Sequence, residues 1–357
     1  MTPKYRQIAD ALRQQIEDQV YPSGSLLPTE HQLHETFSAS RQTVRQALQC
    51  LVDDGLITRR QGSGSRVTDR IGVSGAPKHT VAIITTYIGE YIFPTILREA
   101  EAVLSANHFT TTIYATGNQV SVERRILQDL LREKKIDGVL VEGTKTTLPN
   151  PNLDLYRELQ AMGIPLIFLH GSYDGLSNAV TILDDNYGGG RQLVDYLVHK
   201  GHRSIAGIFK SDDIQGHQRY AGFISALQDH GIPIEDRNIY WYRTEDKEEM
   251  QHEHALWTDK IAPVLRRNTA VVCYNDEVAS FVVRSLLRDQ VKIPDEIAVV
   301  SFDNSIYSNL SVCRITSLSH GSYNAGRIAA EALLQLLRGK LVRSVVMPWT
   351  LIEKESS

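Results

Sequence analysis

The sequence predicts an α/β protein in two parts: a small N-terminal winged helix-turn-helix and a larger pair of doubly wound parallel sheets. Three observations indicate this fold class. Up to about residue 67, apolar residues recur at helical spacing and end in a Gly-Ser-Gly hairpin. From about residue 80, short apolar runs alternate with helix-length segments, as in parallel sheets covered on both faces. Between them, residues 68–79 are rich in Gly, Ser and Pro, a linker composition.

Length, charge and cysteine content limit the possible functions. With 357 residues, the chain is long enough for two or three domains. A formal net charge of -4 excludes a polybasic coat, so any nucleic-acid surface must be local. Cys50, Cys273 and Cys313 lack metal-ligand spacing, and neither a signal-peptide pattern nor an 18-residue apolar run occurs. We therefore expect a soluble cytoplasmic protein with reduced cysteines, no membrane partner, no metal and no cofactor.

Two helices are expected in the first 37 residues. Ile8, Leu12 and Ile16 recur every four residues, which is the stripe of one buried helix face. Residues 27–37 then place Thr29 where its side chain can cap a short second helix.

A third helix is expected after the tight turn formed by residues 38–40. Ser40 is placed to cap this helix and Gly55 to end it. Its inward apolar stripe consists of Val44, Leu48 and Leu51. Residues 56–67, LITRRQGSGSRV, read as two short strands around a Gly-Ser-Gly turn, a hairpin of the kind called a wing.

The second and third expected helices, joined by the turn at residues 38–40, form a helix-turn-helix. Such a motif presents the N-terminal end of its later helix to the major groove of DNA. The polar residues at that end are Arg41, Gln42, Thr43 and Arg45. Arginine bonds a guanine edge bidentately and glutamine an adenine edge, each worth roughly 1–3 kcal/mol of discrimination. The alternative is that Arg41 and Arg45 decorate a solvated face. Against this alternative, a second arginine cluster lies in the wing, at Arg59, Arg60 and Arg66. The wing tip, residues 61–64, suits close approach to phosphate or a minor groove.

The rest of the chain alternates predicted strands and helices. The apolar runs are residues 81–86, 137–142, 164–169, 204–209, 270–274 and 297–302. Helix-length segments include residues 96–104, 189–198 and 279–287. About 275 residues of this pattern exceed one sheet, so we expect two lobes, with a ligand site beyond the carboxyl ends of the strands.

Residues 1–67 resemble the winged-helix domain of the GntR family of bacterial repressors. The segments that carry this resemblance are PKYRQIADALRQQI, LLPTEHQL, SASRQTVRQAL and GLITRRQGSGSRV. The resemblance implies DNA-facing positions at Lys4, Thr29, Glu30, Ser40, Arg41, Gln42, Thr43, Arg45, Arg60, Gln61 and Gly62. Glu30 would accept from a cytosine amine or orient an arginine; a plain helix-start carboxylate favoured by the macrodipole remains the alternative.

From about residue 80 onward, the chain resembles the periplasmic-binding-protein-like effector domain of LacI/GalR repressors. The motifs GHRSIAGIF, QRYAGFISAL, YNDEVA, IPDEIAVVSFDNS and ITSLSH stand in the order of that family. The resemblance implies a sugar-binding domain over residues 80–357. Its first lobe would comprise about 80–183 and 320–343, and its second about 184–319 and 344–357. The linker lacks the pattern of the hinge helix found in LacI-type chains, and we expect the wing to replace that helix.

A GntR-type winged-helix domain followed by a LacI-type effector domain is the architecture of arabinose-responsive repressors of Gram-positive bacteria. The segments TTYIGEYIFPTILREAE, DGVLVEGTK, TILDDNYGGG and GIFKSDDIQG resemble that group, which implies L-arabinose as effector. Sugar sites read hydroxyls with carboxylates, amides and guanidinium groups, and cover C–H faces with aromatic rings. The polar positions implied are Glu142, His170, Arg219, Asn275, Asp303 and His320. The aromatic positions are Tyr87, Tyr91, Phe93 and Tyr274.

Each of these residues has a plainer interpretation. Asn275 and Asp303 are also placed to cap the helices that follow them. Arg219 has acidic partners available at residues 212 and 213, on the surface. The histidines would then be ordinary connecting residues, and Tyr91 and Phe93 part of the core.

An enzyme is the other class of function to consider. Glu142, Asp276 and Asp303 with the histidines resemble a general acid/base set, but no nucleophile elbow, GxxxxGK loop or HExxH motif occurs. We therefore expect no enzyme but a homodimeric repressor that binds a palindromic operator and releases it when sugar binds between the lobes. A different pentose or small ligand, or a corepressor-type response, is the alternative.

Overall fold

The computed structural model contains two compact units, residues 1–79 and 80–357. It describes residues 3–18, 20–22, 24–53, 56–60, 64–68, 79–176, 179–247, 249 and 256–357. Gly55 and most of the expected linker, residues 69–78, lie outside the described residues. In the part of the chain that is described, no helix is long and apolar enough to cross a membrane.

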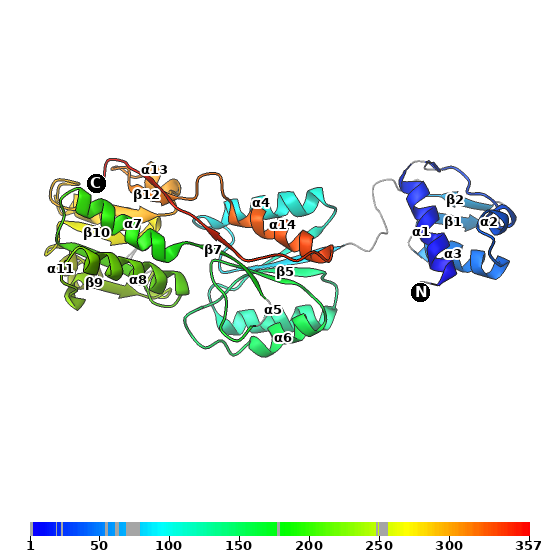
Figure 1. Ribbon diagram of the computed structural model, residues 1–357, viewed down its shortest axis with the longest axis horizontal. Coiled ribbons are helices and arrows are strands. Elements are labelled where there is room, and N and C mark those ends of the chain that lie inside the picture. Colours follow the sequence, from blue (N-terminus) through cyan, green and yellow to red (C-terminus); the bar gives the residue numbers. More distant parts are fainter. Residues whose placement is uncertain are drawn as a thin grey trace. The chain divides into compact units, whose positions relative to one another are not determined.

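The N-terminal unit packs three helices against a hairpin (Figure 1). Its elements are α1 (Lys4–Glu17), α2 (Glu30–Thr36), α3 (Arg41–Asp53), β1 (Ile57–Arg60) and β2 (Gly64–Val67). The two strands are antiparallel, with Ile57 opposite Val67. The predicted stripes are confirmed as the core of this unit, which includes Ile8, Leu12, Ile16, Val44, Leu48 and Leu51. The helix-turn-helix and wing expected from the sequence are therefore present.

Side-chain caps define where α2 and α3 begin. The Thr29 hydroxyl accepts from the backbone N–H of Gln32, and the Gln32 side chain accepts from the backbone N–H of Thr29. The Ser40 hydroxyl accepts from the backbone N–H of Thr43 at 3.1 Å. Both predicted caps are confirmed, and they set the direction in which α3 leaves the turn.

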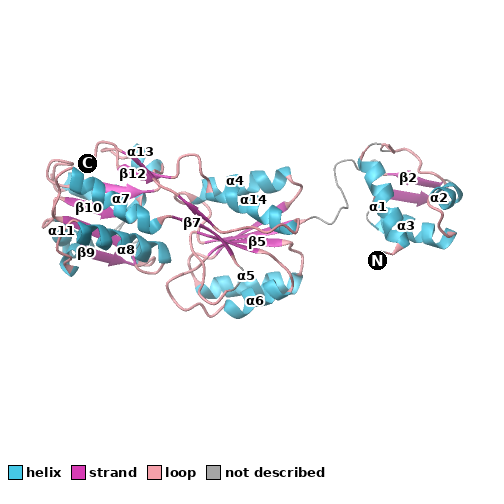
Figure 2. Cartoon of the chain, in the orientation of Figure 1, coloured by secondary structure: helices cyan, strands magenta, loops and turns pink. Residues whose placement is uncertain are grey.

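The first lobe of the second unit is a parallel sheet between two helical layers (Figures 1 and 2). Across the sheet, the strands are β13 (Val345–Met347), β7 (Val180–Asp184), β6 (Leu166–Leu169), β5 (Gly138–Glu142), β3 (Thr80–Thr85) and β4 (Thr110–Ala115). One face is covered by α4 (Phe93–Ala106) and α14 (Ala325–Leu337), and the other by α5 (Val120–Glu133) and α6 (Leu153–Ala161).

The second lobe has the same layering. Across its sheet, the strands are β14 (Thr350–Ile352), β12 (Thr316–Ser319), β11 (Ala298–Phe302), β10 (Ala270–Cys273), β8 (Ile205–Lys210) and β9 (Ile239–Tyr242), and only β14 is antiparallel to its neighbour. One face is covered by α7 (Asn186–His199) and α8 (Ile214–Asp229). The other is covered by η2 (Trp257–Ile261), α11 (Ala262–Leu265) and α12 (Asp276–Arg288). Two short elements, η1 (Asp236–Asn238) and α13 (Ile306–Leu310), lie in connections.

The chain passes between the lobes three times: from β7 to α7, from β12 to α14, and from β13 to β14. One expected lobe boundary is wrong. Residue 344 was expected to start the last segment of the second lobe, but β13 pairs with β7 in the first sheet, with Val345 opposite Ile182. The third crossover therefore falls at Pro348 and Trp349.

All six predicted apolar runs are strands, but the pattern missed others, including β4 and β12. β4 is an edge strand whose side chains are largely exposed, so it needs no apolar run. β12 is buried through Thr316, Ser317 and Leu318, and its hydroxyls find partners only in the folded chain.

Candidate functional site

Several of the predicted DNA-reading residues lie at the exposed start of α3, and others lie on α1, α2 and β1. Arg41, Gln42 and Arg45 are exposed, whereas Val44 on the same helix is buried. The Thr43 hydroxyl lies 2.8 Å from that of Ser40, so both hydroxyls take part in the cap. This polar end of α3 is the part of a helix-turn-helix that meets base edges.

Glu30, at the start of α2, orients two arginines. Its carboxylate accepts from Arg45 Nε on α3 at 2.9 Å and from the guanidinium of Arg59 on β1. Slight burial opposes ionisation, but both guanidinium groups hold the pKa of Glu30 below its ordinary value. Two of the roles considered for Glu30 are therefore present, since it contacts arginines and is also a carboxylate in the first turn of α2. Glu30 links the recognition helix to the wing.

Lys4 joins the start of α1 to the turn before α3. Its Nζ donates to the backbone oxygen of Ser38 at 2.9 Å. Gln61 and Gly62 lie outside the described residues, and so does the side chain of Arg60. Their DNA-facing roles stay predictions.

A cavity lies between the two lobes of the second unit. Nine of the ten predicted effector residues line it: Tyr87, Tyr91, Phe93, Glu142, His170, Arg219, Tyr274, Asn275 and Asp303. His320 is the exception, because its ring lies on the second crossover and its Nε2 is 2.8 Å from Asp184 Oδ1. His320 instead lines an adjoining pocket with Tyr91, His170 and Asp303, and its contact with the effector stays a prediction.

Glu142 extends from the end of β5 into the cavity, and one of its oxygens is saturated. Oε2 accepts from Thr85 Oγ1 at 3.0 Å, from Thr86 Oγ1 at 2.7 Å and from the Thr86 backbone N–H at 2.9 Å. Within the described parts of the chain, Oε1 has no such donor. This leaves a fixed carboxylate oxygen for a hydroxyl donor.

Arg219 is buried at the floor of the second lobe, with 1% of its surface exposed. Its Nε donates to Asn186 Oδ1 at 2.9 Å, another guanidinium nitrogen donates to the backbone oxygen of Tyr274, and Nη2 lies 3.5 Å from Asp303 Oδ1. The suggested surface pairing with residues 212 and 213 is wrong. The guanidinium also lies over the ring of Phe302, 4.2 Å from its centroid.

Asp303 follows β11 with a left-handed backbone, φ 92°. Its carboxylate accepts from the phenol of Tyr91, which belongs to the other lobe. Ser305, not Asp303, caps α13. Asn275 does cap α12, since its Oδ1 accepts from the Val278 N–H at 3.0 Å, yet it also lines the cavity. The capping interpretation thus holds for Asn275 alone.

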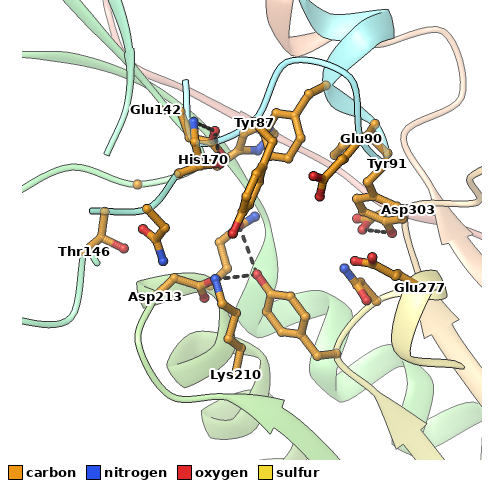
Figure 3. Close-up of a pocket in the computed structure, with 18 of the residues that line it drawn as sticks. Tyr87, Glu90, Tyr91, Glu142, Thr146, His170, Lys210, Asp213, Glu277 and Asp303 are labelled. Atoms are coloured by element: carbon orange, nitrogen blue, oxygen red, sulfur yellow. Dashed lines mark hydrogen bonds and ion pairs between the residues drawn. The ribbon is translucent and has the colours of Figure 1, made fainter. Parts of the chain in front are cut away.

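Figure 3 shows Tyr87, Glu142 and His170 on one side of the cavity, and Lys210 and Asp213 on the opposite side. Lys210 Nζ lies 3.1 Å from Asp213 Oδ2, and Tyr274 donates to the same carboxylate at 2.6 Å. Burial alone would lower the pKa of Lys210, but the carboxylates of Asp213 and Asp212 outweigh burial and raise this pKa. Burial also raises the pKa of Tyr87 to about 12.

Sequence reasoning missed several lining residues, which are Glu90, Asn118, Thr146, Lys210, Asp213, Gln215, Lys247 and Glu277. Lys210 could have been found, because it ends a predicted apolar strand. Glu277 could also have been found, because it stands in the motif YNDEVA, whereas Lys247, 2.8 Å from it, carries no comparable signal. Among the described residues, no group of three or more His, Cys, Asp or Glu side chains is arranged to hold a metal ion.

His170 follows β6 and is buried, with 8% of its surface exposed. Its Nδ1 lies 3.0 Å from Asp184 Oδ2, while its buried Nε2 has no partner in the described structure. Burial opposes protonation, but the Asp184 carboxylate outweighs it and raises the pKa of His170 to about 9. At neutral pH this ring is a cation with one N–H unused.

Comparison with known proteins gives consistent results for both units. Residues 4–67 match the model of the bacterial regulatory proteins of the gntR family, and residues 194–357 match a periplasmic binding protein-like domain. The chain is 35% identical, over 94% of its length and 90% of the relative's, to the arabinose metabolism transcriptional repressor of Halalkalibacterium halodurans. It is 34% identical to the Geobacillus stearothermophilus protein of that name, over 96% of this chain and 93% of the relative.

Solved structures share the fold at lower identity. A LacI-type regulator from Alkaliphilus metalliredigens complexed with D-xylulofuranose superposes with a TM-score of 0.65 at 22% identity, covering 78% of this chain and 98% of that one. A complex of the regulator CelR with cellobiose reaches 0.64 at 22% identity, covering 89% and 92%. At these identities, the likeness concerns the fold.

Proposed function

Because the chain belongs to the family of arabinose metabolism transcriptional repressors, we propose that its effector is L-arabinose, bound in the cavity between the lobes. The chain is a transcriptional repressor of sugar genes and not an enzyme. The observation that carries the proposal is the set of cavity residues, in which Glu142 and His170 of one lobe face Arg219, Asn275 and Asp303 of the other.

The chemistry of this set suits a neutral polyol. Sugar hydroxyls donate and accept, so they satisfy the carboxylates of Glu142 and Asp303 as well as the N–H groups of Arg219 and His170. The rings of Tyr87 and Tyr274 line the same cavity and offer apolar faces to sugar C–H groups. Since these groups come from both lobes, a bound sugar favours one relative arrangement of the lobes.

We further propose that α3 reads the operator. Arg41, Gln42 and Arg45 would contact base edges or phosphates, and Glu30 would hold Arg45 in its approach. Sugar binding would lower operator affinity, with a coupling of typically about 1–3 kcal/mol.

A homodimer on a palindromic operator completes the proposal. Support comes from α13 and the residues after it, where Ile306, Leu310 and Val312 are 60%, 76% and 86% exposed. Three apolar side chains this close together on a monomer surface suit burial against a second copy. Leu310→Glu should shift the chain toward monomer in analytical ultracentrifugation; an unchanged dimer would place the interface elsewhere.

The effector proposal is tested by titrating operator complexes with a panel of pentoses. L-arabinose is expected to dissociate the complex, while D-xylose and D-ribose leave it intact. Dissociation by another sugar alone would replace the proposed effector. Tighter operator binding with L-arabinose would mean a corepressor instead.

A further inference from the structure

Each of the three crossovers contributes one side chain to a single cluster. Asp184 ends β7 on the first crossover, His320 follows β12 on the second, and Trp349 lies on the third. His320 Nε2 is 2.8 Å from Asp184 Oδ1, and its ring stacks on that of Trp349 with centroids 3.6 Å apart and planes inclined by 22°. We call these three residues the crossover clamp.

Both ring nitrogens of His320 lie close to an oxygen atom. Its Nδ1 lies 3.1 Å from the backbone oxygen of Pro348, and its Nε2 lies 2.8 Å from Asp184 Oδ1. Burial opposes ionisation of Asp184, but the His170 and His320 rings hold the pKa of its carboxyl well below the ordinary value. The contact between Asp184 and His320 thus joins two crossovers.

Asp184 also joins the clamp to the cavity from both lobes. Its Oδ2 accepts from His170 Nδ1 of the first lobe at 3.0 Å and from Gln215 Nε2 of the second at 2.6 Å. Both of these donors line the cavity. A ligand that moves His170 relative to Gln215 must therefore change the contacts of Asp184.

Trp349 makes a second connection to the cavity. Its ring packs against Phe302, with centroids 5.6 Å apart, and lies 5.7 Å from the guanidinium carbon of Arg219. Its indole N–H is buried without a partner in the described structure. Arg219, which lines the cavity, and Trp349 of the third crossover thus belong to one packed group.

We propose that the crossover clamp couples the contents of the cavity to the relative orientation of the lobes, and through it to operator affinity. Asp184, His320 and Trp349 act here as positioning residues and need not touch the effector. This inference rests on the proposed function, since it concerns how sugar binding would reach the operator. In physical terms, the clamp has two arrangements, and the bound effector favours one of them over the other.

The test separates coupling from sugar binding in the full-length chain. The coupling is the ratio of operator Kd with saturating L-arabinose to operator Kd without it, measured by fluorescence anisotropy; calorimetry gives the sugar Kd. His320→Phe keeps the stacking ring but removes both ring nitrogens. This variant should bring the ratio close to one, which is a measurable change because typical couplings are about 5–150-fold. Its sugar Kd should stay within about threefold of the wild-type value. Asp184→Asn, which keeps the side-chain volume, should lower the ratio as well.

His230→Phe is the matched control. His230 Nε2 lies 2.7 Å from Asp195 Oδ1, but this histidine–aspartate pair is on the surface of the second lobe and away from the crossovers. It should leave both quantities unchanged. Circular dichroism melting of every variant verifies that it is folded.

A wild-type ratio in folded His320→Phe and Asp184→Asn would overturn the clamp. So would a loss of sugar affinity with full release at higher sugar concentration, since that behaviour belongs to a binding residue. If the wild-type complex does not respond to L-arabinose, the proposed effector is wrong, and the ratio is measured with whichever pentose releases the operator. If none does, both proposals fail.

Discussion

The predicted DNA-reading surface and the proposed sugar cavity use the same residue type in opposite environments. The Arg45 side chain is 68% exposed and has one carboxylate partner, whereas the Arg219 side chain is 2% exposed and is held on several sides. An exposed ion pair contributes about 0–1 kcal/mol to stability, while removing one partner of a buried pair costs about 3–5 kcal/mol. The contrast teaches that Arg45 is free to serve its predicted role in recognition, whereas Arg219 contributes to folding as well as to the proposed sugar site.

The largest expected effect comes from Arg219→Ala. It leaves Asp303 with an uncompensated charge in a buried site, so the effector domain should lose about 3–5 kcal/mol and melt roughly 10 °C lower by calorimetry. Arg237→Ala is the matched control, because the pair of Arg237 with Glu235 is exposed. Equal melting temperatures for the two variants would remove the contrast between buried and exposed arginines.

The next effect is a pH dependence of the effector domain. The pKa of His170 is raised to about 9, so its contribution to stability is complete below the unfolded-state pKa near 6.5 and is lost as pH rises through about 9. The charged groups acting on His170 are Asp184, Glu142 and Asp303. The loss should be on the order of 2–3 kcal/mol in urea unfolding between pH 6.5 and 9.5.

His170→Gln is the control for this pH dependence, and it should flatten the profile over that window. Asp276 does not interfere, because burial raises its pKa only to about 6, below the window. A profile of the same slope in His170→Gln would assign the pH dependence to another group.

Arg45→Ala tests the exposed side of the comparison. Operator affinity should fall by about 1–3 kcal/mol if Arg45 bonds a base, with sequence discrimination reduced at that position. Melting temperature and L-arabinose affinity should stay unchanged, since the side chain is exposed. Arg13→Ala on α1, a half-exposed arginine paired with Asp10, serves as the comparison variant. A uniform loss on all DNA sequences would make Arg45 a phosphate contact.

The smallest effect is expected from Thr29→Ala. Loss of the capping box should destabilise the N-terminal unit by about 1 kcal/mol, with no change in the melting of the effector domain. Thr36→Ala, at the other end of the same helix, should cost less. A change in both units would show that they unfold together.

Local patterns predicted most of the fold. Helical periodicity identified α1 and α3, hydroxyl residues identified the starts of α2 and α3, and six apolar runs identified strands. β4 was missed because an edge strand needs no apolar run, and β13 was assigned to the wrong lobe because its three residues carry no signal for one sheet over the other. Strand partners are chosen by tertiary contacts.

Nine residues of the candidate cavity were likewise predicted, because they follow strand ends or stand in family motifs. Lys247 was missed, since its position does not differ locally from a solvated helix residue, and Glu277 was missed although it stands in the motif YNDEVA. The position of His320 beside a crossover is visible in the sequence, but the direction of its ring, which places it in an adjoining pocket, is not.

The sequence by itself determined the two-part architecture, the caps and buried stripes of the N-terminal unit, and the residue types available for DNA and sugar. These depend on neighbours within a few positions along the chain, where spacing dictates geometry. Only the tertiary structure decided that Glu30 holds two arginines, that Arg219 pairs with Asp303, and that Asp184 meets His170, Gln215 and His320. Those contacts join residues that are brought together only when distant segments pack, and burial then makes each charge depend on its partner.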